Sequence, residues 1–369
     1  MFAIALCSAS AQPTGRGHHL ESIVADQVKS ILPADGRFGV AIVLLSGDKA
    51  FFFEHGWANR EANTAVTRDS LFNLASVSKV FDTTLLALAA QRGELKLDDP
   101  ISKHVPEIRG KHAAGITLRQ LASHTSGFTL PQDHPPWPEK NYTWAEFVDV
   151  LNAWTPDHEP GTRLVYSHGG FMLLHVALER ALGAPYSDLL EHRILAPLEL
   201  ASTTLPRPGA TFRGVLPPKL RQRAVQGYSF EGAAAGEPGE QQGFYHWPGT
   251  GQMYSSARDM AVFLAANLGR GANKHLAVAM QQAQQSVFQI DAATTIGLAW
   301  ERQEVNGHTV VAKYGSLYNS AAYIAFIPDR QLGIAVLCNR GGQDVIGLGR
   351  EIMGKVGAID LSSSSVPQR

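Results

Sequence analysis

The sequence predicts an α/β protein in which one antiparallel sheet is flanked by helices and carries an inserted all-helical lobe. Two observations predict this fold class. Strand-like apolar runs joined by short polar turns gather near both ends of the chain, at 38–55 and 309–338. The stretch between them shows helical patterns and loops rich in proline and glycine, with few strand patterns. We therefore expect both chain ends to contribute strands to one sheet.

The elements of the first third follow from local patterns. An amphipathic helix is expected over 19–32, because Leu20, Val24, Val28 and Ile31 share one face. The apolar runs that follow predict a hairpin, and a long helix then starts at Ser76. The predicted ranges are strands 38–45 and 50–55 with a turn at 46–49, a helix from 76 to near 93, and a short helix within 116–127 that ends in a loop.

The last third returns to strands after one more helix. The apolar runs there alternate with short polar breaks, which is typical of antiparallel strands. The predicted ranges are a helix over 254–269, strands over 298–304, 309–314, 321–327 and 332–338, and a closing helix over 345–356.

Domain limits follow from this order of elements. We predict a sheet lobe over 12–96 and 246–360, a helical lobe over 97–245 and a disordered tail over 361–369. The opening residues 1–11 are apolar and end in Ala9-Ser10-Ala11, which resembles a signal-peptide cleavage site, although a basic start is missing. We interpret them as a signal-peptide remnant, with a flexible apolar terminus as the alternative, and expect a periplasmic or secreted protein.

Composition excludes several classes of function. The formal net charge of −1 and the scattered basic residues argue against a nucleic-acid surface or a polybasic membrane anchor. No later segment has the roughly 20 apolar residues of a membrane span. No metal-ligand spacing and no glycine-rich phosphate loop is seen, so no metal or cofactor is expected. A disulfide between Cys7 and Cys338 is not expected either. We expect a monomer that binds a small molecule or peptide.

The pair Ser76 and Lys79 is the first candidate for chemistry. At the start of a helix, a lysine three residues after a serine lies on the same face and can reach its hydroxyl. A desolvated lysine can lose its proton and activate the serine as a nucleophile. The ordinary alternative is a helix cap and a solvated lysine. The same spacing recurs at Ser46 and Lys49, in a predicted turn, so spacing alone does not decide.

Two later segments carry a family resemblance. They are Tyr166-Ser167-His168 within 160–170, and Lys313-Tyr314-Gly315 within 312–316. With Ser76 and Lys79, their order resembles the serine β-lactamase and penicillin-binding protein superfamily. The chain looks most like class C β-lactamases and related D-alanyl-D-alanine peptidases and esterases. The segments 97–100, 121–127 and 254–260 also look like landmarks of that family, whose β-lactamase/transpeptidase-like fold the resemblance implies.

The resemblance implies a role for each matching residue. Ser76 would be the acylated nucleophile, Lys79 its base partner, and Tyr166 the group that passes a proton to the leaving group. Lys313 would support the tyrosine and attract a substrate carboxylate. The backbone N–H groups of Ser76 and Ser316 would form the oxyanion hole. Taken singly, Tyr166 could be a half-buried aromatic residue and Lys313 an edge-strand lysine.

Weaker candidates are assigned with their ordinary alternatives. Gln132 lies where a contact to a substrate amide is expected. Asn339 follows the last strand and either binds a substrate carboxylate or caps the strand. His124, in a loop, is expected to be solvated or locally hydrogen-bonded.

Two positions depart from the family pattern. His168 stands where the family has an asparagine, and it cannot offer the same pair of donor and acceptor. Tyr314 replaces a threonine and either narrows the pocket or points away from it.

The resemblance thus implies a serine hydrolase that forms an acyl-enzyme and hydrolyses β-lactams or D-alanyl peptides, with antibiotic resistance as a biological role. A carboxylesterase of the same fold is one alternative. A non-hydrolytic penicillin-binding sensor or scaffold is the other, and the two departures make it worth testing.

Overall fold

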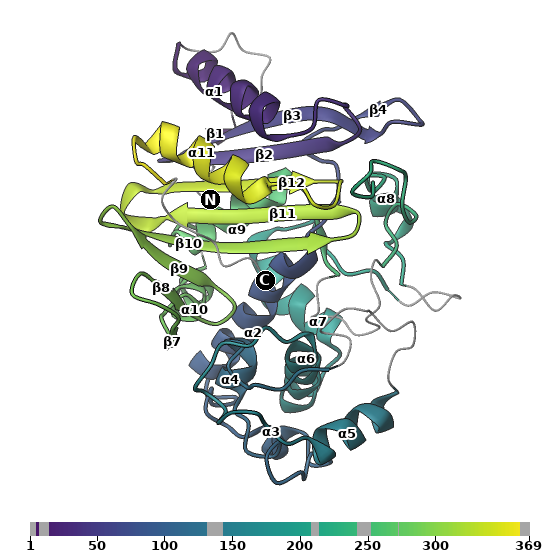
Figure 1. Cartoon of the computed structure of the whole chain (residues 1–369), viewed down its shortest axis with the longest axis vertical. Coiled ribbons are helices and arrows are strands. Elements are labelled where there is room, and N and C mark those ends of the chain that lie inside the picture. The colour runs from purple at the N-terminus through teal and green to yellow at the C-terminus, as the bar shows by residue number, and fades with distance from the viewer. Residues whose placement is uncertain are drawn as a thin grey trace.

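The protein is described by a computed structural model, which covers residues 5–6, 15–130, 143–207, 214–241, 252–271 and 273–361. A single large sheet dominates its upper half (Figure 1). Its strands follow one another in space in the order β1 (Ala5–Leu6), β3 (Lys49–Asn59), β2 (Gly39–Ser46), β12 (Leu332–Cys338), β11 (Ser320–Ile327), β10 (His308–Leu317), β9 (Glu301–Val305), β8 (Thr294–Ile296) and β7 (Phe288–Gln289), and β4 (Thr64–Ala65) pairs with β3.

The two ends of the chain meet in the middle of this sheet. Strand β2 pairs antiparallel with β12 along its length, from Val40 opposite Cys338 to Ser46 opposite Leu332. The hairpins β2–β3 and β11–β12 lie on either side of that seam. The prediction of one antiparallel sheet built from both chain ends is confirmed.

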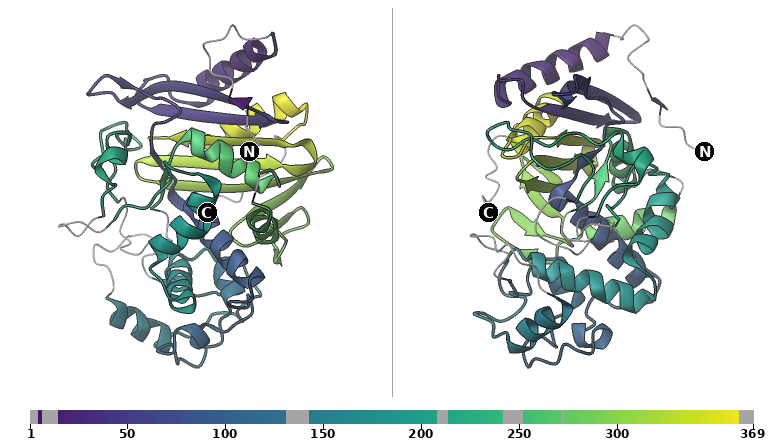
Figure 2. Two further views of the ribbon diagram at one scale, coloured as in Figure 1. Left: turned by 180° about the vertical axis from the view of Figure 1, so that it is seen from behind. Right: turned by 90° about the vertical axis from the view of Figure 1, so that its right-hand side faces the viewer.

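Side chains of the central strands alternate between two apolar layers, as a strand period of two residues requires. Val40, Ile42 and Leu44 face α1 (Gly15–Ile31) and α11 (Val345–Gly357). Ala41, Val43 and Leu45 lie in the other core, with α9 (Ala257–Asn267). Helices therefore cover both faces of the sheet (Figure 2).

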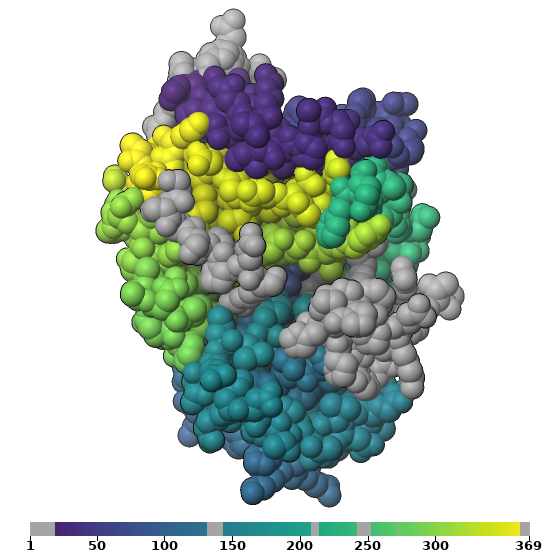
Figure 3. Space-filling view, viewed as in Figure 1, coloured from purple at the N-terminus to yellow at the C-terminus, as the bar shows by residue number. Residues whose placement is uncertain are grey.

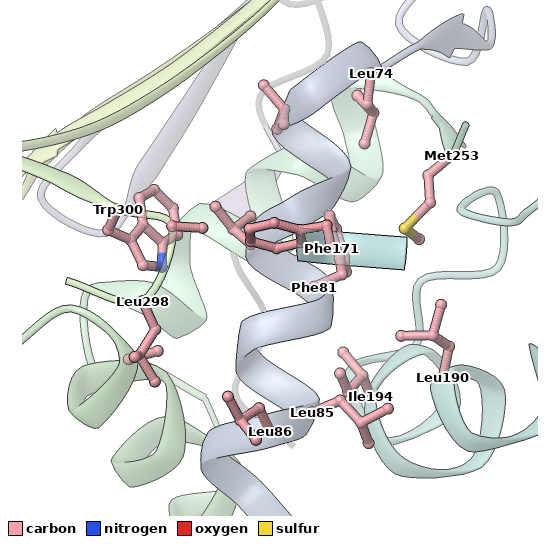
Figure 4. Close-up of a cluster of buried hydrophobic side chains, with 14 of the residues drawn as sticks. Leu74, Phe81, Leu85, Leu86, Phe171, Leu190, Ile194, Met253, Leu298 and Trp300 are labelled. Atoms are coloured by element: carbon pink, nitrogen blue, oxygen red, sulfur yellow. The ribbon is translucent and has the colours of Figure 1, made fainter. Parts of the chain in front are cut away.

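Helix α2 (Lys79–Gln91) runs from beneath the sheet into the helices of the lower half (Figure 1). Apolar side chains surround it, among them Phe171 and Ile194 on one side and Trp300 on the other (Figure 4). The remaining helical elements are α3 (Ile101–His104), α4 (Leu118–Ala122), α5 (Trp144–Ala153), α6 (His168–Leu182), α7 (Tyr186–Leu190), η3 (Glu191–Leu195), η4 (Ala196–Leu198), α8 (Pro218–Arg221), α10 (Lys274–Ala283) and η5 (Pro328–Arg330). Burial of α2 on all sides explains why its sequence is apolar almost throughout.

Most predicted elements are present, with local differences. The helix predicted over 254–269 begins at Ala257, because Tyr254–Ser255 form strand β6, which pairs with β5 (Phe72–Asn73). Helix α10 and the short strands β7 and β8 were not predicted. In the described part of 97–245 there are isolated bridges but no named strand. The domain limits stay predictions, and that at 246 falls outside the described residues, as does most of the tail.

No helix in the described ranges is long and apolar enough to cross a membrane.

Candidate active site

The candidate nucleophile, Ser76, lies in a tight turn rather than in a regular helix. Residues Ala75–Ser78 form a 3₁₀ turn (η1) that leads directly into α2. Ala75 has a φ of 47°, a conformation that costs a non-glycine residue of the order of 1 kcal/mol or more. The Asn73 side chain accepts a hydrogen bond from Ala75 N at 2.8 Å and holds this turn. Ser76 thereby lies just before the N-terminal end of α2, with its side chain partly exposed.

Two side chains from different parts of the chain converge on the Ser76 hydroxyl. Lys79 Nζ donates a hydrogen bond to Ser76 Oγ at 3.2 Å. Tyr166, in the loop before α6, donates from its hydroxyl to the same Oγ at 2.7 Å. The spacing of Ser76 and Lys79 thus has the geometry of an activated nucleophile, with a second proton carrier on its other side.

Two lysines flank the Tyr166 ring. The Nζ atoms of Lys79 and Lys313 each lie 5.3 Å from its centroid. Burial raises the pKa of Tyr166, but the charges of Lys79 and Lys313 and the hydrogen bond with Ser76 lower it, to about 8. A phenol whose pKa lies near neutral pH is suited to accept and return a proton.

Strand β10 passes directly over the nucleophile's backbone. A Cβ added to Gly315 would lie 2.5 Å from Leu74 O and 2.7 Å from Ser76 N, so only glycine fits this approach. Next to it, Lys313 lies opposite Ile324, which belongs to the core on the α2 side of the sheet. Because directly opposed residues share a face, Lys313 points towards Ser76.

The backbone of Ser316 is oriented by the two hairpins that contain β10. Both hairpins have two-residue turns, closed by the pairs Val305–His308 and Leu317–Ser320. The closing pair of such a hairpin is hydrogen-bonded, and bonding then alternates along the strand. Ser316 therefore directs its N–H away from β11, to the edge that β9 leaves open beyond Ala312. This places a donor where the oxyanion hole is expected.

Two histidines adjoin Tyr166. His168 is the first residue of α6, and its ring meets the Tyr166 ring edge-on with centroids 5.2 Å apart. His124 is buried and stacks on the same ring at 4.1 Å, and its Nδ1 accepts a hydrogen bond from Ser167 N. The solvated alternative for His124 is wrong, and the hydrogen bond to its side chain comes from a residue 43 positions away rather than from a local one. The stack depends on contact between distant segments, which a loop sequence does not reveal.

The remaining predicted site residues have different outcomes. Asn339 is fully buried, accepts a hydrogen bond from Gly39 N, and donates to Trp57 O and Gln226 O at 2.9 Å. With its amide used in this way, it joins segments of the chain, and the carboxylate-binding interpretation is wrong. Gln132 lies outside the described residues.

Tyr314 points away from the nucleophile. It pairs with Tyr323, which lies in the core beneath α1 and α11, so both rings are on the opposite face of the sheet. The alternative in which Tyr314 narrows the pocket is therefore wrong.

The surface is hollowed between the green strands and the teal helices (Figure 3).

Within the described ranges, no three His, Cys, Asp or Glu side chains are grouped as a metal site would require. The hydroxyl and cations around Ser76 are suited to acyl transfer.

Comparison with known proteins shows which family the chain belongs to. The family model described as Beta-lactamase matches residues 20–353, which is most of the chain. The chain belongs to the beta-lactamase family. Among curated members, a beta-lactamase of Pseudomonas fluorescens is 26% identical, over 87% of this chain and 94% of the relative. The D-alanyl-D-alanine-carboxypeptidase/endopeptidase AmpH of Escherichia coli K12 is 27% identical, over 92% and 91%.

Solved structures of beta-lactamase family members share the fold. A class C beta lactamase from Rhodobacter sphaeroides superposes with a TM-score of 0.79 at 26% identity, covering 91% of this chain and 99% of its own. A beta-lactamase/D-alanine carboxypeptidase from Pseudomonas syringae gives a TM-score of 0.80 at 25% identity, covering 90% and 98%. The predicted fold class is thereby confirmed.

Proposed function

We propose that this protein is a serine hydrolase that forms an acyl-enzyme on Ser76 and hydrolyses the amide of a β-lactam or a D-alanyl peptide. One observation carries the proposal: the hydroxyl of Ser76 receives hydrogen bonds from both Lys79 and Tyr166. The names of the curated relatives, a beta-lactamase and a D-alanyl-D-alanine-carboxypeptidase, support this substrate class.

In the acylation step, Ser76 Oγ attacks the carbonyl carbon of the amide. Its proton passes to the unprotonated member of the Lys79–Tyr166 pair, and a C–O bond forms as the carbonyl oxygen becomes an oxyanion. The N–H groups of Ser76 and Ser316 stabilise that charge. The C–N bond then breaks, and Tyr166 returns the proton to the leaving nitrogen.

Deacylation repeats these transfers with water in place of the serine. The Tyr166 hydroxyl lies 2.7 Å from Ser76 Oγ, so it can also take a proton from a water that approaches the ester carbon. Attack by that water breaks the ester bond and returns Ser76 to its free form. Lys313, buried beside Tyr166, supplies the positive charge that keeps the phenol acidic.

The test is covalent labelling with a fluorescent penicillin, followed over time. We expect label that forms and then disappears in the wild type, and no label in Ser76→Ala. Ser46→Ala is the matched control, because Ser46 begins the same four-residue motif but lies in strand β2. Label that survives in Ser76→Ala would refute the nucleophile. Label that persists in the wild type would indicate a penicillin-binding sensor or a peptidase-type protein, and hydrolysis of simple esters alone would indicate a carboxylesterase.

A further inference from the structure

A carboxyl-bearing residue, Asp82, lies next to the site and has no role in the mechanism above. Asp82 follows Lys79 by three residues on α2, so the two side chains leave the helix on neighbouring sides. It is 2% exposed, and Lys79 is fully buried. Neither carboxyl oxygen of Asp82 has a hydrogen-bond partner among the described residues.

The surroundings of Asp82 do not suit a carboxylate. Its neighbours on α2 pack against apolar side chains from α6, α7, η3 and the segment before β9 (Figure 4). An ionised carboxylate that is buried without donors is far more costly than a neutral carboxylic acid. Burial accordingly raises the pKa of Asp82 well above its usual value, and the charge on Lys79 opposes this rise only in part.

Other elements packed against α2 also carry ionisable groups. Those on α6, α7, η3 and α10 include His175, Tyr186, Arg193, Lys274 and His275. His175 and Tyr186 are buried and stack on each other, Arg193 pairs with Glu94, and the two residues of α10 are exposed. The charge that acts on Asp82 is that of Lys79.

We propose that Asp82 is a positioning residue, a neutral carboxylic acid beside Lys79 whose ionisation switches the site off. The proposal rests on the proposed function, because it concerns how Lys79 acts on Ser76 and Tyr166.

The reason is electrostatic. A negative charge on Asp82 would hold Lys79 as an ammonium ion, which cannot accept the proton of Ser76. Where Lys79 is already charged and Tyr166 is the base, the carboxylate would instead offset the positive charge that Lys79 exerts on Tyr166 and so raise the pKa of that phenol. Both effects weaken the proton transfers, so activity falls when Asp82 loses its proton to solvent at alkaline pH.

The first arm of the test is a pH profile of kcat/KM for the wild type and Asp82→Asn, a neutral side chain of the same shape. We expect the variant to keep activity near neutral pH. Activity of the wild type should fall up to tenfold per pH unit on the alkaline side, and this limb should be absent or displaced upwards in Asp82→Asn. Asp26→Asn, an exposed helical aspartate on α1, is the matched control and should leave the limb in place.

The second arm needs no activity. A carboxyl that keeps its proton in the folded state, but loses it near pH 4 when unfolded, gives a stability that falls as pH rises above that value. The unfolding equilibrium constant of the wild type should therefore rise, by up to tenfold per pH unit, relative to that of Asp82→Asn. The infrared C=O band of a protonated carboxylic acid should also persist in the wild type at neutral pH and be lost in the variant.

Three results would overturn the proposal. One is loss of activity in Asp82→Asn at every pH, which would mean that a carboxylate is required. Another is an alkaline limb and a stability profile that the substitution leaves unchanged. The third is absence of the protonated-acid band from the wild type, which can be measured even if the variant does not fold. Failure of the proposed function would instead appear as loss of penicillin labelling in the wild type, with the infrared and stability results unaffected.

Discussion

At the scale of single residues, the environment of Tyr166 determines how pH acts on the reaction. Its pKa of about 8 is set by burial, which raises it, and by Lys79, Lys313 and Ser76, which lower it. The phenolate accepts a proton, so kcat/KM should rise with pH along an acidic limb whose midpoint lies near pH 8, below the alkaline fall attributed to Asp82. Lys313→Gln removes one cation, raises the pKa of Tyr166 and should move this acidic limb to higher pH.

The control for this prediction is Lys219→Gln, which removes an exposed lysine on α8. This variant should leave the acidic limb of the kcat/KM profile at the same pH as in the wild type. Lys313 is also a candidate for binding the substrate, so its loss can lower kcat/KM at every pH. The quantity to compare is therefore the pH at the midpoint of the acidic limb, not the maximum value of kcat/KM. A midpoint that does not move in Lys313→Gln would mean that Tyr166 is not the titrating base.

His168 is the residue by which this chain departs most from the family pattern. Its ring lies beside Tyr166, where the family has an asparagine amide. We expect His168→Asn to restore a donor and acceptor for the substrate amide, and to raise β-lactam hydrolysis relative to ester hydrolysis by about tenfold, the value of one hydrogen bond. Steady-state rates on one cephalosporin and one simple ester give this ratio. Equal losses on both substrates, with a lower Tm, would show that His168 only supports the start of α6.

At the scale of secondary-structure elements, the close contact between β10 and the η1 turn is the critical one. Gly315→Ala places a methyl group within 3 Å of Leu74 O, Ser76 N and Val77 N, so the strand must move away from the nucleophile. Displacing the Ser316 N–H should lower the acylation rate by roughly 10²–10³-fold, the usual effect of losing one oxyanion donor. Stopped-flow acylation with a chromogenic cephalosporin measures it.

Gly333→Ala offers a matched control in the same sheet. Its added methyl group would have its nearest neighbour, Phe326 Cβ, at 3.5 Å, an ordinary contact distance. We expect this variant to acylate at nearly the wild-type rate. Similar losses in both variants would indicate that any added methyl group in the sheet perturbs the site, and the specific role of the β10 contact would be withdrawn.

Sequence patterns predicted the elements whose formation is local. The strands that contain Ile324 and Val336 are nearly continuous apolar runs, and burial on two faces requires that composition. The Ser76 and Lys79 pair was predicted because helical spacing alone brings the two side chains together. Convergence of Tyr166 and Lys313 came only from family resemblance, since no local pattern relates them to Ser76.

Features that depend on tertiary packing were not predicted from the sequence. The φ of 47° at Ala75 occurs in a turn that packs against β10 and β11, and alanine by itself has no preference for that conformation. The burial of Asp82 is likewise unexpected, because an aspartate in a helix is usually solvated. Helix α10 was also missed, although its buried residues Leu276, Ala279, Met280 and Ala283 recur at helical spacing.

At the scale of the whole molecule, Asn339 joins three distant parts of the chain. Its amide bonds Gly39 N, Trp57 O and Gln226 O in a fully buried site. Asn339→Ala would leave all three groups unsatisfied and should lower the free energy of unfolding by about 3 kcal/mol, at roughly 1 kcal/mol for each bond. Urea denaturation measures the loss.

The same variant separates a structural role from substrate binding. The fraction of molecules that the fluorescent penicillin labels measures the folded fraction, and the acylation rate is divided by it. The corrected rate should remain within about twofold of the wild type, because the amide of Asn339 does not reach the cleft. An unchanged stability with a raised KM would contradict this account and return Asn339 to the substrate site.

The seam between β2 and β12 has a consequence for biosynthesis. Strand β2 ends at Ser46 and its neighbour β12 begins at Leu332, so a long stretch of chain is synthesised between them. Pairing across such a sequence separation is slow, because the whole intervening chain must be closed into a loop. Strand β10 also emerges long after Ser76, so a nascent chain holds its nucleophile and lysine without the strand that completes the site. We therefore expect the nascent chain to stay inactive until β10 has been made and has docked over the nucleophile.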